Sequence, residues 1–510
     1  MFTIIDFFFI SRSISLLIQS LLLSFLWVQA GCVYKTSNHD YPNIVIIYAD
    51  DMGFGDAQCY NSKSLIPTPN IDQMAASGML FTDAHSSSAV CTPSRYSLLT
   101  GRYAWRTSLQ KHVLWPWEKP LIDTARLTLP EMLQDKGYQT AAVGKWHLGW
   151  EWPTVDSEKV IDGTNIDYTQ SIEGGPLDHG FNFYFGDDVP NFPPYTFIEN
   201  EQVTEVPTMM KPDSLFGDQG MMVEGWDLTA VMPKITSKAI EYINKFSGED
   251  KPFFLYFALT APHTPIAPLE KYKGKSKAGL YGDFVCEVDS TVGKIIQAIE
   301  ENEMSKNTLL IFTSDNGSPG RDGENWSGEI GSVKAYGHLP NCTLRGYKGD
   351  IWEAGHRIPF IVKWPDKVKS GMTNKELICQ VDIMRTIAEI IDYELPDNAA
   401  EDSYNLLPAL LQNHDEFVRK DLIHHSWNGS FAIRQGDWKL IMTESSGGFR
   451  NHESDSSSTG QLYNLKSDLE ESNNLYNSFP EKVDSLKQLL AEYKLNDRST
   501  KRVEQLQSSK

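Results

Sequence analysis

The chain has 510 residues, of which 41% are hydrophobic and 22% charged, the composition of a folded globular protein. Its net charge of −21 excludes general binding to nucleic acid or to an anionic membrane surface. An anion site in such a chain therefore needs a local cluster of positive side chains. The length predicts one large domain, or a large domain with a smaller partner.

The first 31 residues predict a signal peptide. Residues 14–28 are a largely apolar run, shorter and less well flanked than a membrane span requires. The run is followed by Ala30-Gly31-Cys32, which fits cleavage after Ala30 and also the end of a bacterial lipoprotein signal, with Cys32 as the lipidated residue. Both alternatives stay open. Either predicts export to the periplasm or cell surface, with membrane contact only through a lipid anchor at Cys32.

Three apolar runs, each followed at once by polar residues, predict buried strands at 43–51, 252–263 and 309–316. Such runs are typical of parallel strands covered on both faces. Helix-like stretches at 129–136 and 292–301 alternate with them, so we expect an α/β domain with a mostly parallel sheet. Ligands of such sheets bind beyond the carboxyl ends of the strands, where the polar residues of all three runs lie.

The pattern changes after residue 415. The predicted elements there are strands at 431–434, 438–442 and 461–464 and a helix that begins near Ser478. Glu481 follows Ser478 at capping-box spacing, and Pro480 suits a first helical turn. We therefore expect a catalytic domain over 42–415, a smaller antiparallel α+β domain over 416–497 and a flexible tail over 498–510.

The segment from Cys91 to Gly101 carries the strongest chemical signal. Pro93 near its start and Gly101 at its end predict a short helix. Cys91 would lie at the helix N-terminus, where free N–H groups and the helix dipole favour anions. Arg95 lies one turn further along the same side. A lone cysteine before a helix is usually just buried, but this combination predicts a site for a sulfate or phosphate group.

The string Cys91-x-Pro93-Ser94-Arg95-x-x-x-Leu99-Thr100-Gly101 resembles, position for position, the signature of the type I sulfatases of the alkaline phosphatase superfamily. Five further segments resemble other motifs of that family, in the same order: Asp50-Asp51-Met52-Gly53, Gly144-Lys145-Trp146-His147-Leu148-Gly149, Pro262-His263-Thr264-Pro265, Ser314-Asp315-Asn316-Gly317 and Leu344-Arg345-Gly346-Tyr347-Lys348-Gly349. The resemblance covers residues 42–495. One departure is Ala354-Gly355-His356, where many members carry two glycines.

The resemblance implies an alkaline-phosphatase-like sulfatase fold and a modified catalytic residue. In the family a separate maturation enzyme oxidises the cysteine, here Cys91, to formylglycine (3-oxoalanine). The hydrated aldehyde then attacks sulfur, His263 or Lys348 assists the departing alcohol, and His147 acts as the base that expels sulfate. Arg95, Lys145, His147, His263 and Lys348 would surround the sulfate group. Each alone is more often structural, but together they form the positive cluster that the net charge requires.

Two pairs of polar residues at predicted strand ends are candidate metal ligands. Asp50-Asp51 and Asp315-Asn316 are singly more typical of turns or helix caps. If they converge, their oxygens suit a hard cation, and Ca²⁺ tolerates irregular geometry better than Mg²⁺. The resemblance implies the same ion, one per chain, with position 91 (Cys91) as a further ligand.

The remaining histidines and aromatic residues allow either a structural or a substrate-contacting interpretation. His179 is predicted to be structural and His85 to support the Cys91 loop, while His356 and the pair His424-His425 could reach the substrate from the rim. The aromatic residues between 150 and 197 could stack on a sugar, but packing is the favoured interpretation. They include Trp152, Phe183, Tyr184, Phe185 and Tyr195.

The sequence therefore predicts a sulfatase, a sulfuric ester hydrolase that desulfates a polysaccharide or its oligosaccharides. Export favours algal polymers such as ulvan or carrageenan over glycosaminoglycans. Two alternatives stay open: a phosphonate or phosphodiester hydrolase of the same superfamily, and a carbohydrate-binding homologue without turnover. The complete set of polar residues favours the sulfatase.

Overall fold

The computed structural model describes residues 41–413, 419–449 and 458–500. The predicted signal peptide, Cys32 and residues 501–510 of the predicted tail lie outside the described residues. The predicted domain boundary near 415 also lies outside them and stays a prediction. Within the described ranges, no helix is long and apolar enough to cross a membrane.

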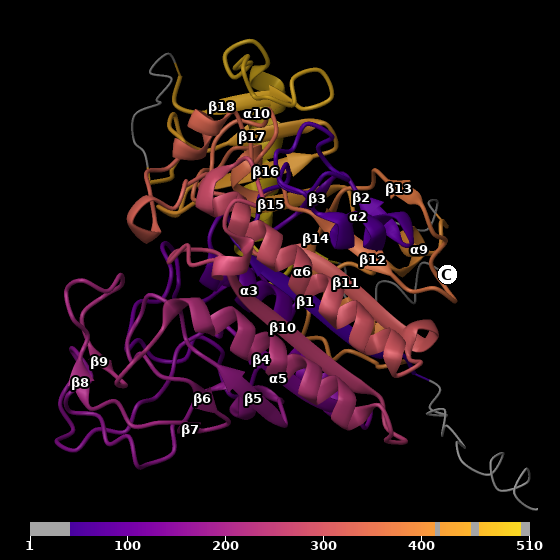
Figure 1. Cartoon of the computed structure of the whole chain (residues 1–510). Helices are drawn as coiled ribbons and strands as arrows, with labels where there is room; N and C mark the ends of the chain where they lie inside the picture. The colour runs from indigo at the N-terminus through magenta and orange to yellow at the C-terminus, as the bar shows by residue number, and fades with distance from the viewer. Residues whose placement is uncertain (1–40, 414–418, 450–457, 501–510) are drawn as a thin grey trace, which may run out of the picture. The chain divides into compact units, whose positions relative to one another are not determined.

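A ten-stranded mixed sheet forms the framework of the fold (Figure 1). In spatial order its strands are β13 (Met372–Asn374), β2 (Met79–Phe81), β12 (Phe360–Lys363), β11 (Thr308–Ser314), β1 (Asn43–Asp50), β10 (Phe253–Pro262), β4 (Gln139–Gly144), β5 (Phe183–Gly186), β6 (Ile198–Glu199) and β7 (Gln202–Val203). The central run from β11 to β5 is parallel, and antiparallel pairs flank it. The predicted mostly parallel sheet is therefore confirmed, and β1, β10 and β11 are the three predicted strands.

Helices cover both faces of this sheet. On one face lie α3 (Cys91–Thr100), α4 (Leu129–Asp135), α8 (Ile383–Ile390) and α9 (Leu407–Leu410), and on the other α2 (Pro69–Ala76), α5 (Val231–Phe246) and α6 (Gly279–Glu301). A further short helix, α7 (Glu353–His356), precedes β12. The stretch predicted at 129–136 is α4, and the one predicted at 292–301 is the second half of the longer α6.

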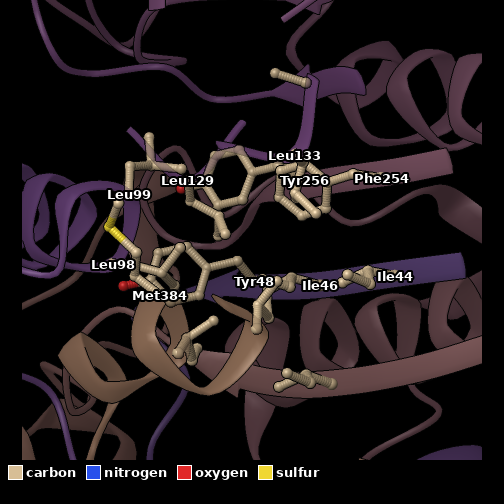
Figure 2. Packing of buried hydrophobic residues seen from close by; sticks show 14 of the residues in the cluster. Ile44, Ile46, Tyr48, Leu98, Leu99, Leu129, Leu133, Phe254, Tyr256 and Met384 are labelled. Carbon is tan, nitrogen blue, oxygen red and sulfur yellow. The ribbon is translucent and has the colours of Figure 1, made fainter. Parts of the chain in front are cut away.

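Alternate residues of β1 pack into two separate cores. Ile44, Ile46 and Tyr48 lie in the cluster that includes residues of α3, α4 and α8, and Figure 2 shows them in a row along β1, with Tyr48 at the end toward Leu98 and Met384. The residues between them along β1 belong to the opposite cluster, with α2, α5 and α6. All are fully buried. Burial of each such side chain contributes roughly 1.5–3 kcal/mol, so an uninterrupted apolar run is what this position in the sheet requires.

A smaller antiparallel sheet follows, as predicted. Its strands are β15 (Asp421–His425), β16 (Phe431–Gln435), β17 (Trp438–Ile441) and β18 (Gln461–Asn464), and α10 (Pro480–Leu495) packs on it. Two short pairs complete the described strands: β3 (Ala84–His85) with β14 (Ile378–Cys379), and β8 (Met209–Met210) with β9 (Met221–Met222). The sequence did not predict β15.

The predicted capping box of α10 is wrong. The residue before the helix is Phe479, without a side-chain cap hydrogen bond. Ser478 donates its backbone N–H to Leu475 in the preceding turn, one residue too early to cap the helix. Of the predicted tail, Arg498 forms an ion pair with Asp397 at 2.6 Å.

Candidate active site

Strand register brings the predicted polar clusters together. In the parallel pairs of β1, Ala49 lies opposite Ser314 and Asp50 opposite Pro262. The residues that leave β1, β10 and β11 therefore meet at one edge of the sheet, as the carboxyl ends of parallel strands must. Lys145 directly follows β4 and donates its N–H to the carbonyl of Ala258 at 2.9 Å. The site is thus assembled from the ends of four neighbouring strands.

Four oxygen-bearing side chains converge there, all at most 2% exposed: Asp50, Asp51, Asp315 and Asn316. The Asp51 N–H donates to Asp315 Oδ1 at 3.0 Å, and Asn316 Nδ2 donates to Asp51 Oδ1 at 2.7 Å. Asp50 Oδ1 and Asn316 Oδ1 have no hydrogen-bond partner among the described residues. Buried acceptors without a partner are costly, and an all-oxygen set suits a hard cation. These residues therefore fit the predicted ion.

The pKa values of the buried carboxyl groups in this cluster depend on nearby charge. Burial, and then the neighbouring Asp50 carboxylate, raise the pKa of Asp315 to about 7. Burial acts in the same direction on Asp50, but Lys145, His263 and Arg95 outweigh it and hold the pKa of Asp50 well below its usual value. A bound cation would favour the ionised form of both carboxyls.

Three buried cations pair with the three carboxylates. Arg95 Nη2 donates to Asp315 Oδ2 at 2.9 Å, and Lys145 Nζ donates to Asp50 Oδ2 at 2.8 Å. Lys348 Nζ lies 2.7 and 2.9 Å from the two carboxylate oxygens of Asp51. Arg95 and Lys145 are at most 1% exposed and Lys348 8%. The three predicted positive side chains therefore lie together at the site, each paired with a carboxylate.

Cys91 is the first residue of α3, as predicted. Gly101 ends the helix in the left-handed conformation, with φ of 64°, which glycine adopts without strain. Lys348 Nζ lies 3.3 Å from Cys91 Sγ. Burial nevertheless raises the pKa of Cys91 to about 12. The unmodified side chain is thus a neutral thiol, a poor nucleophile at neutral pH.

The tautomer of His147 is set by the backbone. Its Nε2 lies 2.9 Å from the carbonyl oxygen of Leu114, which can only accept, so Nε2 carries the proton. Nδ1 is then the acceptor, and it has no hydrogen-bond partner in the described part of the chain. Burial, followed by the charges of Lys145 and Arg95, lowers the pKa of His147 well below its usual value. The ring is therefore neutral, with a lone pair available to accept a proton.

A cavity of about 250 Å³ opens onto these groups. It is lined by five predicted site residues, Asp51, Cys91, His147, His263 and Lys348. The other predicted residues are Asp50, Arg95, Lys145, Asp315 and Asn316. Asp315 and Asn316 bond to Asp51 of the first set, Arg95 bonds to Asp315 and contacts Asp50, and Lys145 bonds to Asp50. All ten predicted site residues are thus brought together.

The sequence did not predict most of the cavity wall. Trp115, Phe192, Trp427 and Phe449 also line it. They lie in separate loops and follow no periodic pattern, so no sequence signal distinguishes them from other aromatic residues.

The proposed rim histidines are not at the rim. His356, His424 and His425 are at most 3% exposed and do not line the cavity. The rings of His356 and His424 stack with centroids 3.5 Å apart, and His85 Nδ1 faces His356 Nδ1 at 3.0 Å. The sequence could not place His424 and His425 because β15, the strand that carries them into the interior, was not predicted, and His356 lies in the short helix α7.

The structural interpretation is confirmed for His179 and for three aromatic residues of the stretch 150–197, whereas Phe192 of the same stretch lines the cavity. His179 is 2% exposed and stacks on Trp146. Tyr184, Phe185 and Tyr195 are at most 2% exposed and belong to the packed interior. The five cysteines that the structure describes are free thiols.

Comparison with known proteins gives consistent matches over nearly the whole chain. A family model described as Sulfatase matches residues 42–393, and one described as N-sulphoglucosamine sulphohydrolase, C-terminal, matches residues 347–499. The N-acetylgalactosamine-6-O-sulfatase of Bacteroides thetaiotaomicron is 33% identical over 513 residues, which covers 91% of this chain and 96% of that protein. The N-acetylgalactosamine-6-sulfatase of Rattus norvegicus is 31% identical and covers 78% of this chain and 71% of its own length.

A solved structure agrees with these matches. Its description concerns the metabolism of multiple glycosaminoglycans by Bacteroides thetaiotaomicron. It superposes on this chain with a TM-score of 0.77 at 31% sequence identity. The superposition covers 90% of this chain and 100% of that one.

Proposed function

The chain belongs to the sulfatase family and hydrolyses sulfate esters, and from this premise we propose that its substrate is N-acetylgalactosamine 6-O-sulfate in glycosaminoglycan-type saccharides. The observation that carries the proposal is the 33% identity to an N-acetylgalactosamine-6-O-sulfatase over nearly the full length of both proteins. A mammalian N-acetylgalactosamine-6-sulfatase at 31% identity supports the same sugar. The algal polymers expected from the sequence rest on context alone, so we prefer the glycosaminoglycan class.

We propose that one Ca²⁺ is held by Asp50, Asp51, Asp315 and Asn316. Support comes from the convergence of four buried oxygen-bearing side chains and from the Oδ1 atoms of Asp50 and Asn316, which accept no hydrogen bond from the described residues. The ion would stabilise negative charge that develops on the sulfate group.

We propose that Cys91 acts after conversion to formylglycine by a maturation enzyme. Support comes from the motif around Cys91 and from the neutral thiol, which would itself be a poor nucleophile. When present, the hydrated aldehyde supplies two hydroxyl groups on one carbon, one to attack sulfur and one to expel sulfate.

The remaining steps fall to the chain's own side chains. Arg95, Lys145 and Lys348 are fixed by their carboxylate partners and would orient the sulfate and stabilise its developing charge. His147 Nδ1 would accept the proton of the second hydroxyl. Of the two candidate acids, Lys348 is kept protonated by Asp51 and would donate a proton to the departing sugar oxygen. Burial lowers the pKa of His263 to about 4, and its Nδ1–H faces the carbonyl of Thr264, so the neutral ring would orient that oxygen rather than protonate it.

The test is sulfate release from defined sugars. The protein would be produced with a formylglycine-generating enzyme and assayed by ion chromatography on N-acetylgalactosamine 6-sulfate, its 4-sulfate isomer and carrageenan oligosaccharides. We expect release from the 6-sulfate, and none from a Cys91→Ala variant. A preference for the 4-sulfate or for carrageenan would contradict the substrate, and a fully active preparation whose Cys91 peptide shows only thiol by mass spectrometry would contradict the modification.

We further propose that the protein is exported, on the basis of the apolar run before Ala30-Gly31-Cys32. Fractionation of the producing cells, with a Cys32→Ala variant to test lipid anchoring, would check it. A cytoplasmic full-length chain would contradict it.

A further inference from the structure

Four aromatic side chains form a continuous wall from the catalytic histidine to the mouth of the cavity. The Phe192 ring packs edge-on against His147, with centroids 5.7 Å apart. From there the ring centroids follow one another at 6.0 Å from Phe192 to Trp115, 6.2 Å from Trp115 to Trp427 and 4.6 Å from Trp427 to Phe449. The wall thus joins loops of the large sheet to segments of the small one.

Trp427, at the centre of this wall, is held in place by its backbone. It lies in the loop between β15 and β16, and its N–H donates to the carbonyl of Gly349 at 2.9 Å. Its own carbonyl accepts from the N–H of His112 at 2.8 Å, and the His112 ring packs on the indole at 4.6 Å. Gly349 directly follows Lys348, so the indole is placed relative to the sulfate-binding cluster before any ligand arrives.

Gly349 also accommodates Phe449. It has a φ of 90°, and a Cβ there would come within 2.7 Å of the Phe449 ring. The absence of a side chain lets Phe449 lie over the segment that carries Lys348. This close approach fixes a second aromatic ring beside Trp427.

Two side chains of the wall leave much of their apolar surface exposed to solvent. Trp115 is 48% exposed and Phe449 42% exposed, although both line a cavity that contains Cys91. The charged side chains of the cavity belong to the sulfate cluster, except Arg321, which donates to the side chain of Ser327 at 3.1 Å. Such a wall suits an uncharged ring with one apolar face, because the electron-rich aromatic face attracts polarised C–H groups.

The size of the cavity limits what that ring can be. Its volume of about 250 Å³ is just below the roughly 300–1,000 Å³ typical of sites for drug-sized ligands. A sulfate group with one sugar ring is of this size.

We propose that the sugar ring that carries the sulfate packs against the aromatic wall formed by Trp115, Trp427 and Phe449, and that these side chains select saccharide sulfates over other sulfate esters. The inference rests on the proposed function in one respect, that the substrate is a sulfated carbohydrate. Trp115, Trp427 and Phe449 lie outside the sequence motifs of the sulfate site.

The test separates binding of the sugar from binding of sulfate. The variants are Trp427→Ala, Trp427→Phe and Trp115→Ala, with Trp326→Ala as the matched control, because Trp326 is 38% exposed and does not line the cavity. Each is assayed on N-acetylgalactosamine 6-sulfate and on ethyl sulfate, which has no ring. Inhibition by inorganic sulfate reports on the charged cluster alone.

For Trp427→Ala we expect kcat/KM on the sugar sulfate to fall about tenfold or more, mainly through KM, as expected for loss of a buried aromatic contact. Turnover of ethyl sulfate and inhibition by sulfate should change less than about twofold, and Trp427→Phe should recover part of the loss. Should Trp427→Ala not fold, the exposed Trp115→Ala carries the same comparison, with a smaller loss.

An unchanged KM for the sugar sulfate in Trp427→Ala and Trp115→Ala, or an equal loss on ethyl sulfate, would overturn the inference while the proposed function stands. If the wild-type protein prefers another sulfated sugar, the proposed substrate fails, and the same comparison on that sugar decides the inference. A wild-type protein that desulfates no saccharide would overturn both.

Discussion

Addition of Ca²⁺ to chelator-treated protein should raise its midpoint of thermal unfolding. Asp50 Oδ1 and Asn316 Oδ1 are buried without a hydrogen-bond partner among the described residues, and each such acceptor costs about 1–3 kcal/mol. An ion that contacts both would remove this cost. By mass action, an ion at 100 times its Kd stabilises the folded state by about 2.7 kcal/mol. For a domain of this size that corresponds to a rise of several degrees.

The assay is thermal unfolding of the protein produced without a maturation enzyme, which keeps Cys91 as a thiol, in chelator and then across a Ca²⁺ titration. Asn316→Ala should lose most of the response. Asp289→Asn is the matched control, since Asp289 is also buried but its carboxylate accepts from the Asn70 side chain at 2.7 Å. No shift at millimolar Ca²⁺, or a full shift in Asn316→Ala, would refute the assignment of these oxygens as ligands.

Three further predictions concern acid stability, a glycine and the base. Burial lowers the pKa of His356 and His424 well below 6.5. Below about pH 6.5 the unfolded chain therefore binds more protons than the folded one. As the pH is lowered further, the free energy of unfolding should decrease by up to about 1.4 kcal/mol per pH unit for each group. Urea unfolding at pH 7.5 and 5 measures this, and an identical pH dependence in His424→Leu would count against it. Gly349→Ala should destabilise the protein by roughly 1–3 kcal/mol because φ is 90° and Phe449 is too close; an unchanged urea midpoint would contradict the contact. His147→Ala should lower kcat about 10²–10⁴-fold in protein that still unfolds cooperatively, and near-normal kcat would exclude His147 as the base.

The sequence by itself determined three adjacent strands of the main sheet, β11, β1 and β10, and the chemistry at their carboxyl ends. A strand such as β1, which packs into two cores, needs apolar residues at every position, and that produces a run that can be read without a structure. Polar residues such as Asp50 and Asp315 are recognisable because they end such runs. Cys91 and Arg95 are recognisable because a helix N-terminus with a nucleophile and an arginine requires a short, fixed spacing.

Only the tertiary structure decided the shape of the pocket around that chemistry. Trp427 becomes a cavity residue through backbone bonds to His112 and Gly349, which lie far from it in sequence. His424 is buried because β15 pairs with β16, and five residues with two histidines give no clear alternation from which to predict a strand. A motif of fixed spacing reflects contacts within one short segment or the position of a polar residue at the end of a strand. The aromatic wall depends on contacts between distant loops, and these leave no periodic trace in the chain.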